Sequence, residues 1–199
     1  TRLLERQIPH ELQLHADMVE PLFDSIGHLQ AEGAVKARDV PQVLGLLEDV
    51  ARHARSSFPE EGLLVVLLGA GDWRPRAADL AGSEYLQAVH GRVAGRPAID
   101  LALEKGVQEL CRRAIAEGVV RSAHDCSDGG LAVALAECCI QGGVGFRGQV
   151  GLPRRWDVAL FGERQSRIVV SLPSGNLPRL RRLAAELSVP ALELGVTGG

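Results

Sequence analysis

The residues best suited to chemistry lie in one stretch near the middle of the chain, Ser122–Gly130, with the sequence SAHDCSDGG. It combines an imidazole, two carboxylates, two hydroxyl groups, a thiol and a glycine pair, and an apolar run follows it. The pattern predicts a strand that ends near Asp125 and a helix that begins near Gly129. Backbone amides at a helix N-terminus are free and lie at the positive end of the helix dipole, so they attract anions. The candidate ligand-binding residues are His124, Asp125, Ser127, Gly129 and Gly130.

Residue chemistry alone leaves two interpretations of this stretch open. Asp125 and Asp128 could accept hydrogen bonds from the free amides, in which case the cluster only caps a helix. The same carboxylates could instead hold a divalent cation that bridges to a phosphate. The glycine spacing matches neither a Walker loop nor a dinucleotide-binding fingerprint. Cys126 lies between acidic residues, which should raise the pKa of its thiol and weaken it as a nucleophile.

A second polar stretch, GERQSR, occupies Gly162–Arg167. We expect it to form a tight turn between two apolar strands, DVALFG and SRIVVSL. Glu163, Gln165 and Ser166 are its candidate binding residues, because amide and hydroxyl side chains suit recognition of a small polar substrate. The alternative is a solvated turn that contains a Glu–Arg pair.

A third stretch, AGSEYLQAVHG at residues 81–91, predicts a short helix. Gly82 and Ser83 would open this helix, with Ser83 as its N-cap and Glu84 in its first turn. All three are candidate cleft residues, although an ordinary capped helix would give the same pattern. The sequence contains no recognisable Ser-His-Asp triad and no activated cysteine, so we assign no catalytic residue.

The surrounding pattern predicts the elements that would position these stretches. Leu63–Gly71 is a continuously apolar strand, Ile99–Gly118 is an amphipathic helix, and Gly130–Ile140 is a helix that is apolar on nearly all sides and therefore buried. Further strands are expected at 143–152, 157–162, 166–172 and 191–196, and a helix capped by Asn176 at 175–187. This order indicates an α/β protein of the α+β type, with a mixed β-sheet packed against helices. Apolar spacings of three and four residues predict a helical segment over residues 1–40, ahead of a domain over residues 41–199.

Composition restricts the possible partners. The chain has 199 residues, of which 46% are hydrophobic and 24% charged, as in folded globular proteins. Its formal net charge of −3 gives no electrostatic reason to expect nucleic acid as a partner. No apolar run approaches the roughly 20 residues that a membrane span needs, so we expect no membrane association. The four cysteines form no CxxC pair and no signal peptide is evident, which favours a cytoplasmic protein.

The three stretches, in this order, resemble the phosphoribosylformylglycinamidine synthase family of the AIR synthase superfamily. The similarity runs from VLGLLEDV through LLVVLLG, GSEYLQAVHG, the long block DLALEKGVQELCRRAIAEGVVRSAHDCSDGGLAVALAECC, ALFGERQSRIVVS and LGVTGG. It covers about three quarters of the chain. Within that family, the sequence is most similar to the C-terminal domain of the second of two domain pairs.

The resemblance implies a fold and a function. The family converts formylglycinamide ribonucleotide to its amidine, with ATP and with ammonia derived from glutamine, and it uses Mg²⁺. The implied partners are an N-terminal AIR-synthase-like domain, with ligands in the cleft between the two domains, and a glutaminase component. An aspartate at the position of Asp125 helps to hold magnesium in the family's first domain pair, and the turn at Glu163–Ser166 binds the ribonucleotide there. Whether ATP or ADP binds to this part of the enzyme alone is left open.

The sequence also departs from the family pattern. Arg164 stands where the family usually has serine, Ala81 replaces a usual glycine, and residues 1–41 match no part of the family. Because the partner domain is missing, we expect this chain to be inactive alone. Residues 1–40 or a second copy of the chain, as a homodimer, would cover an apolar sheet face. A non-catalytic scaffold domain and a kinase relative from the same superfamily are the alternatives.

Overall fold

The computed structural model describes residues 12–14, 52–70, 76–148 and 151–199. Its centre is a six-stranded sheet of order β1-β4-β6-β2-β5-β3, in which every pairing between named strands is antiparallel. The strands are β1 (Leu12–Leu14), β2 (Leu64–Leu68), β3 (Ser122–Asp125), β4 (Phe146–Gly148), β5 (Ile168–Leu172) and β6 (Ala191–Thr197). The helices are α2 (Glu84–His90), α3 (Leu101–Ala116), α4 (Gly130–Gly142), α5 (Trp156–Phe161) and α6 (Leu177–Glu186), with 3-10 turns η1 (Ala77–Leu80) and η2 (Ser174–Asn176). The predicted α+β class is therefore confirmed.

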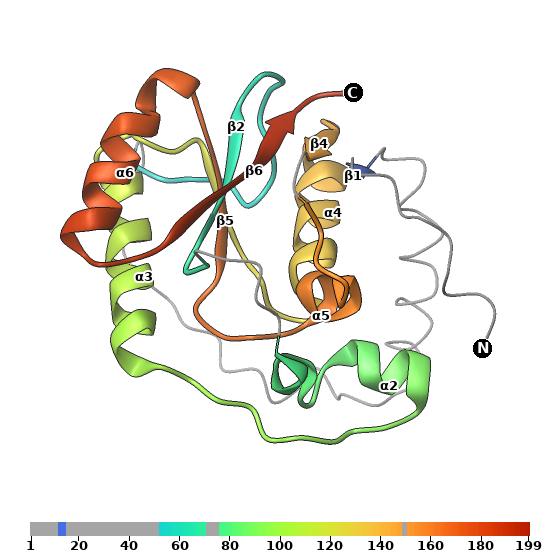
Figure 1. Cartoon of the computed structure of the whole chain (residues 1–199). Helices are drawn as coiled ribbons and strands as arrows, with labels where there is room; N and C mark the ends of the chain where they lie inside the picture. Colours follow the sequence, from blue (N-terminus) through green and yellow to red (C-terminus); the bar gives the residue numbers. More distant parts are fainter. Residues whose placement is uncertain (1–11, 15–51, 71–75, 149–150) are drawn as a thin grey trace, which may run out of the picture.

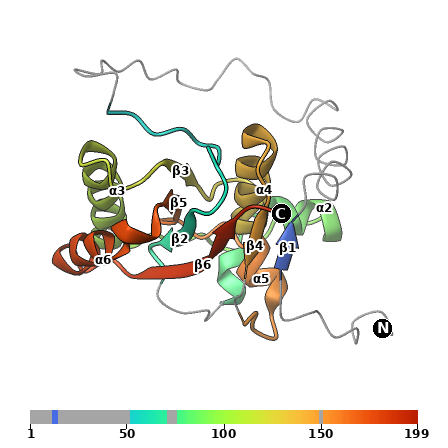
Figure 2. The same ribbon diagram turned by 90° about the horizontal axis from the view of Figure 1, so that it is seen from above.

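Helices cover both faces of the central strands (Figures 1 and 2). Successive side chains of a strand point to opposite faces, so the two faces of β2 belong to two different cores. Val66 and Leu68 pack with α3 and α6, whereas Val65 and Leu67 pack with α4. This double burial explains why β2 is apolar without alternation, and it confirms the strand predicted at Leu63–Gly71.

The two predicted helices next to the candidate stretches are also confirmed. α3 presents Val107, Leu110 and Ala114 to the core, and its N-cap Asp100 accepts hydrogen bonds from the amides of the first turn. α4 buries most of its residues, as its nearly uniform apolar character predicts. These helices fix the positions of the segments that precede them, including Asp125–Gly129.

The DVALFG stretch was predicted as a strand, and this prediction is wrong because Trp156–Phe161 forms the helix α5. A short apolar run has no periodicity that separates a strand from a buried helix. Helix formation places Val158, Ala159 and Leu160 in the interior. It also stacks Phe161 on Tyr85 of α2, with 5.0 Å between the ring centroids. The GERQSR turn therefore connects a helix to β5, not two strands.

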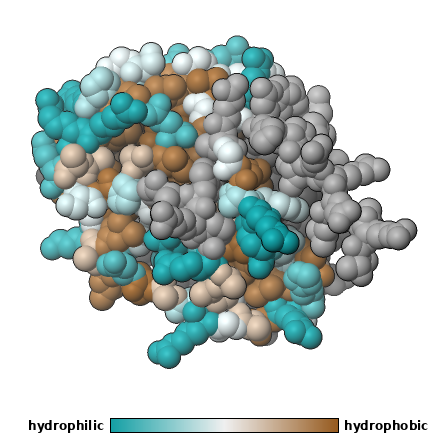
Figure 3. Space-filling model, viewed as in Figure 1, coloured by the Kyte–Doolittle hydropathy of each residue, from teal (hydrophilic) through white to brown (hydrophobic). Residues whose placement is uncertain are grey.

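Three further expectations need correction. Leu12–Leu14, inside the segment predicted as helical, is a strand that pairs with β4, and the rest of residues 1–40 lies outside the described residues. Asn176 occupies the N-cap position of α6, but its side-chain amide donates to the carbonyl of Val119 and makes no cap hydrogen bond. An apolar sheet face in need of cover is not found at β2 and β5, whose two faces are already buried by helices. Figure 3 shows hydrophobic and hydrophilic residues interspersed over the described part of one face.

Candidate ligand-binding cavity

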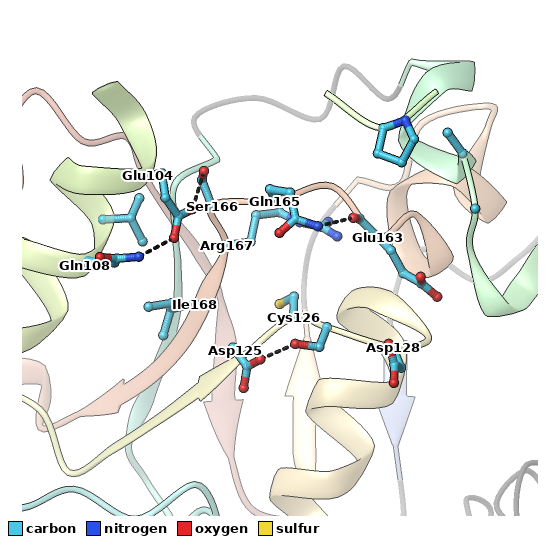
Figure 4. A pocket seen from close by; sticks show the side chains of 15 residues that line it. Glu104, Gln108, Asp125, Cys126, Asp128, Glu163, Gln165, Ser166, Arg167 and Ile168 are labelled. Atoms are coloured by element: carbon cyan, nitrogen blue, oxygen red, sulfur yellow. Dashed lines mark hydrogen bonds between the residues drawn. The ribbon is translucent and has the colours of Figure 1, made fainter. Parts of the chain in front are cut away.

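The three polar stretches meet at one cavity of about 590 Å³ (Figure 4). One wall is the segment between β3 and α4, another is the turn between α5 and β5, and a third is the loop ahead of α2 together with α3. The predicted residues that line the cavity are Gly82, Asp125, Ser127, Glu163, Gln165 and Ser166. A smaller cavity of about 270 Å³ shares Ala81, Pro97, Glu163, Gln165 and Ser166 with the larger one.

Glu163 joins the three stretches. Its Oε1 atom accepts a hydrogen bond from the backbone amide of Glu84 and another from that of Gly129, each at 2.8 Å. These amides belong to the first turn of α2 and to the N-cap of α4. Burial raises the pKa of the Glu163 carboxyl group, and the two amide hydrogen bonds partly oppose this by favouring the ionised form.

Glu163, and not an aspartate, is therefore the side chain that binds the amide at the start of α4. The interpretation of Asp125 and Asp128 as helix caps is wrong: the N-cap is Gly129, in the left-handed region at φ 75°, with no side-chain cap bond from its own residue. Ser127 donates to the Asp125 carboxylate instead. Ser83 does cap α2 as predicted, since its Oγ atom accepts from the amide of Leu86 at 3.3 Å.

Ser166 is held in an unusual backbone conformation on the cavity wall. Its φ of 66° lies in the left-handed region, which residues other than glycine, asparagine and aspartate rarely adopt. The Ser166 hydroxyl donates to Glu104 of α3 at 2.7 Å, and the Gln108 amide donates to the same carboxylate at 2.6 Å. Gly69 lets this turn approach β2, because a Cβ atom there would lie 1.8 Å from the Ser166 carbonyl oxygen. Such local strain often marks a functional site.

The carboxylates of Asp125 and Asp128 and the amide of Gln165 provide further polar groups of the wall. Gln165 is exposed and donates to the Glu163 carbonyl at 3.4 Å. Among the described residues there is no group of three or more His, Cys, Asp or Glu side chains able to hold a metal ion. Any cation at Asp125 would therefore need ligands from the bound molecule, from water or from outside these residues.

His124 is not among the residues that line the cavity. Its side chain is largely buried, and its Nε2 atom lies 3.3 Å from the Glu137 carboxylate of α4. Its Nδ1 atom is 2.7 Å from the carbonyl oxygen of Asp125. Burial raises the pKa of Glu137, and His124 opposes that shift. The structure therefore places His124 against α4, behind the cavity wall.

Arg167 is the buried cation of the site. It lies at the start of β5, is 9% exposed, and donates to the backbone carbonyls of Gly162 and Arg164. Burial lowers its pKa, and the nearby Arg164 lowers it further. Burial also raises the pKa of the neighbouring Cys126 to about 11, with a smaller contribution from Asp125. The expectation that Cys126 is a weak nucleophile holds, although burial is a larger cause than the acidic neighbours.

Sequence reasoning missed Glu104, Gln108 and Arg167 as cavity residues. Glu104 and Gln108 are separated by one helical turn, a pattern typical of any solvated helix face. Only the packing of α3 against the turn at Ser166 reveals that this face is a cavity wall. Arg167 follows directly after Ser166, and a charged residue ahead of an apolar strand usually indicates the end of a turn.

Comparison with known proteins agrees with the fold. The family model described as AIR synthase related protein, C-terminal domain, matches residues 60–199. A phosphoribosylformylglycinamidine synthase subunit PurL from Anaeromyxobacter sp. (strain Fw109-5) is 48% identical over 168 residues, which cover 79% of this chain and 21% of the relative. The corresponding subunit from Synechococcus sp. (strain JA-3-3Ab) is 46% identical over 171 residues, covering 83% and 22%. The chain thus spans about a fifth of the length of these relatives.

Solved structures show the same fold. PurL from Thermotoga maritima complexed with FGAR superposes with a TM-score of 0.59 at 21% identity, covering 73% of this chain and 25% of that protein. The same protein complexed with ATP gives a TM-score of 0.53 at 20% identity, covering 73% and 23%. No helix in the described part of the chain is long and apolar enough to cross a membrane. With its antiparallel sheet, its helical layers and a family match over residues 60–199, the chain belongs to the AIR synthase related protein, C-terminal domain family.

Proposed function

We propose that this chain forms one wall of a ligand cleft in a phosphoribosylformylglycinamidine synthase. In this proposal the complete enzyme converts formylglycinamide ribonucleotide to its amidine, with ATP and glutamine-derived ammonia, in the cytoplasm. The high identity to PurL subunits supports the assignment. An N-terminal AIR-synthase-like domain would supply the opposite wall, a glutaminase component would supply ammonia, and the chain would be inactive alone.

The observation that carries this proposal is the convergence of the three polar stretches on one cavity. The segments that reach the cavity are far apart in the sequence: Gly82 from the first, Asp125–Asp128 from the second, and Glu163, Gln165 and Ser166 from the third. The walls combine carboxylates, an amide, a hydroxyl group and a buried cation, which suits a polar ligand that carries both hydrogen-bonding groups and negative charge. The relative from T. maritima has been seen with ATP, with ADP and with FGAR.

Asp125 and Asp128 fit a magnesium ion that arrives with a nucleotide. Protein-bound Mg²⁺ is commonly held by one or two carboxylates together with substrate phosphates and water. Both aspartates line the cavity, and both are only two to five residues from the start of α4. The ion, when bound, would neutralise phosphate charge that these carboxylates would otherwise repel. Gln165 and Ser166 would orient the uncharged part of the ligand.

Calorimetry with Mg-ADP tests this function. Wild type is expected to bind, and Asp125→Ala is expected to lose at least about tenfold in affinity, since it removes a charged ligand of the cation. Glu109→Ala is the matched control, because Glu109 is paired with Arg112 on the exposed side of α3. Equal affinity in wild type and Asp125→Ala, or no binding by either with the fold intact, would favour a scaffold domain whose polar cluster supports only an interface.

A further inference from the structure

The geometry around Glu163 resembles an anion site that the protein has already filled. Anionic ligands bind where backbone amides at helix starts converge, because these amides have no partner inside the helix. Here the amides of Glu84 and Gly129 point at a single atom, the Oε1 of Glu163, at 2.8 Å each. The chain's own carboxylate therefore occupies the position that an anion would take.

The backbone around Glu163 also makes close contacts with the segment that precedes α2 and with the start of α4. Its amide donates to the carbonyl of Asp79 at 2.9 Å, which ties the turn to the 3-10 turn ahead of α2. Gly130 has a φ of 71°, and a Cβ atom there would lie 2.6 Å from the carbonyl oxygen of Gly162. The start of α4 thus presses directly on the turn. Figure 4 shows the Glu163 side chain extending from that turn toward the start of α4.

We propose that Glu163 is a positioning residue: its ionised carboxylate holds the starts of α2 and α4 against the 162–166 turn and so keeps the three cavity walls in register. It is separated by 34 residues from Gly129 and by 79 from Glu84, so its side chain connects segments that are distant in the sequence. A ligand phosphate does not use these two amides while Glu163 occupies them. In this role Glu163 acts on the ligand through the positions of the cavity walls.

The charges that face Glu163 come from each adjoining element. The carboxylates of Glu84 on α2 and Asp128 ahead of α4 disfavour its ionisation, as does burial, whereas the two amide bonds favour it. The buried Arg167 at the start of β5 interacts with it across the turn. Together these effects raise the pKa of Glu163 above its ordinary value of 4.5, so the link should loosen at mildly acidic pH.

NMR of the 199-residue chain tests the link directly. The amide protons of Glu84 and Gly129 should titrate with one shared midpoint above pH 4.5, moving upfield as the pH falls, because each loses a charge-assisted hydrogen bond. In Glu163→Gln this shared titration should vanish while the remaining spectrum stays folded. In Glu163→Ala the hydrogen exchange of both amides should accelerate at least about tenfold. Glu60→Gln, at an exposed glutamate, is the matched control.

Further variants distinguish Glu163 from the neighbouring carboxylates as the group that titrates. A titration that survives Glu163→Gln, or that disappears only in Asp128→Asn or Glu84→Gln, would overturn the proposal. The effect on ligand rests on the proposed function: Glu163→Gln should weaken Mg-ADP binding several-fold. If Glu163→Gln released both amides but left the affinity for Mg-ADP unchanged, Glu163 would not position the walls. That result would also overturn the proposal. If wild type binds no Mg-ADP, the proposed function fails, and the amide titration still decides whether Glu163 forms the link.

Discussion

At the scale of single residues, the site depends on a few positions where side-chain chemistry and backbone conformation coincide. Ser166 adopts a left-handed conformation that costs about 1–2 kcal/mol for a residue with a side chain. Its hydrogen bond to Glu104 and the close approach to Gly69 hold it there. The sequence indicated Ser166 as a polar turn residue, but its conformation depends on α3 and β2, which are distant in the chain. Backbone strain of this kind cannot be deduced from local sequence.

Gly69→Ala tests the close approach of this turn. A methyl group would lie 1.8 Å from the Ser166 carbonyl oxygen, so the turn must move, and we expect a loss of about 3 kcal/mol or more in the free energy of unfolding. Gly62→Ala is the control, because Gly62 also has a positive φ but has no atom within 4 Å of an added Cβ. It should cost only about 1–2 kcal/mol. Urea unfolding measures both, and equal losses would refute the packing argument.

At the scale of elements, the strongest patterns were the most predictable. The sequence predicted β2, α3 and α4 because each contains a long run or stripe of apolar residues. The residues of that run or stripe are also the ones that tertiary packing buries. α5 was missed because six residues are too few to distinguish the two periodicities. The three polar stretches were predicted as candidate sites, but their meeting at Glu163 depends on how α2, α4 and α5 pack. The amide of the N-cap Gly129 therefore donates to Glu163, which is 34 residues away in the sequence and could not be identified from its proximity.

Asp100→Ala tests how α3 is held in place. The Asp100 Oδ1 atom accepts from the amides of Ala102 and Leu103 at 3.0 and 3.1 Å, which makes it the N-cap. Its removal should destabilise the protein by about 1 kcal/mol, with a lower melting temperature. Asp100→Asn keeps a side-chain oxygen that can accept these bonds, so it should retain most of the stability. Thermal unfolding distinguishes the two, and an equal loss in both variants would indicate that charge, not capping, matters.

At the scale of the whole molecule, the fold explains why one cavity can collect residues from so many segments. The sheet order places β3 at one edge beside β5, so the segments after β3 and before β5 lie next to each other. α3 covers the adjoining face and brings Glu104 to the same place. Exposed apolar residues gather in the neighbouring segment at Val89, Val93, Ile99 and Leu101. The homodimer remains a prediction, although the helices on both faces of β2 and β5 remove the reason for expecting a second copy there.

The central claim is that three distant stretches form one wall of a nucleotide cleft. The most direct test is to map the backbone amide shifts of the 199-residue chain during a titration with Mg-ADP. We expect residues 82–84, 125–129 and 163–166 to shift together with a single dissociation constant, and α6, which contributes no residue to the cavity, to be unaffected. Shifts confined to one stretch or located elsewhere, or no shifts at all from a folded protein, would contradict it.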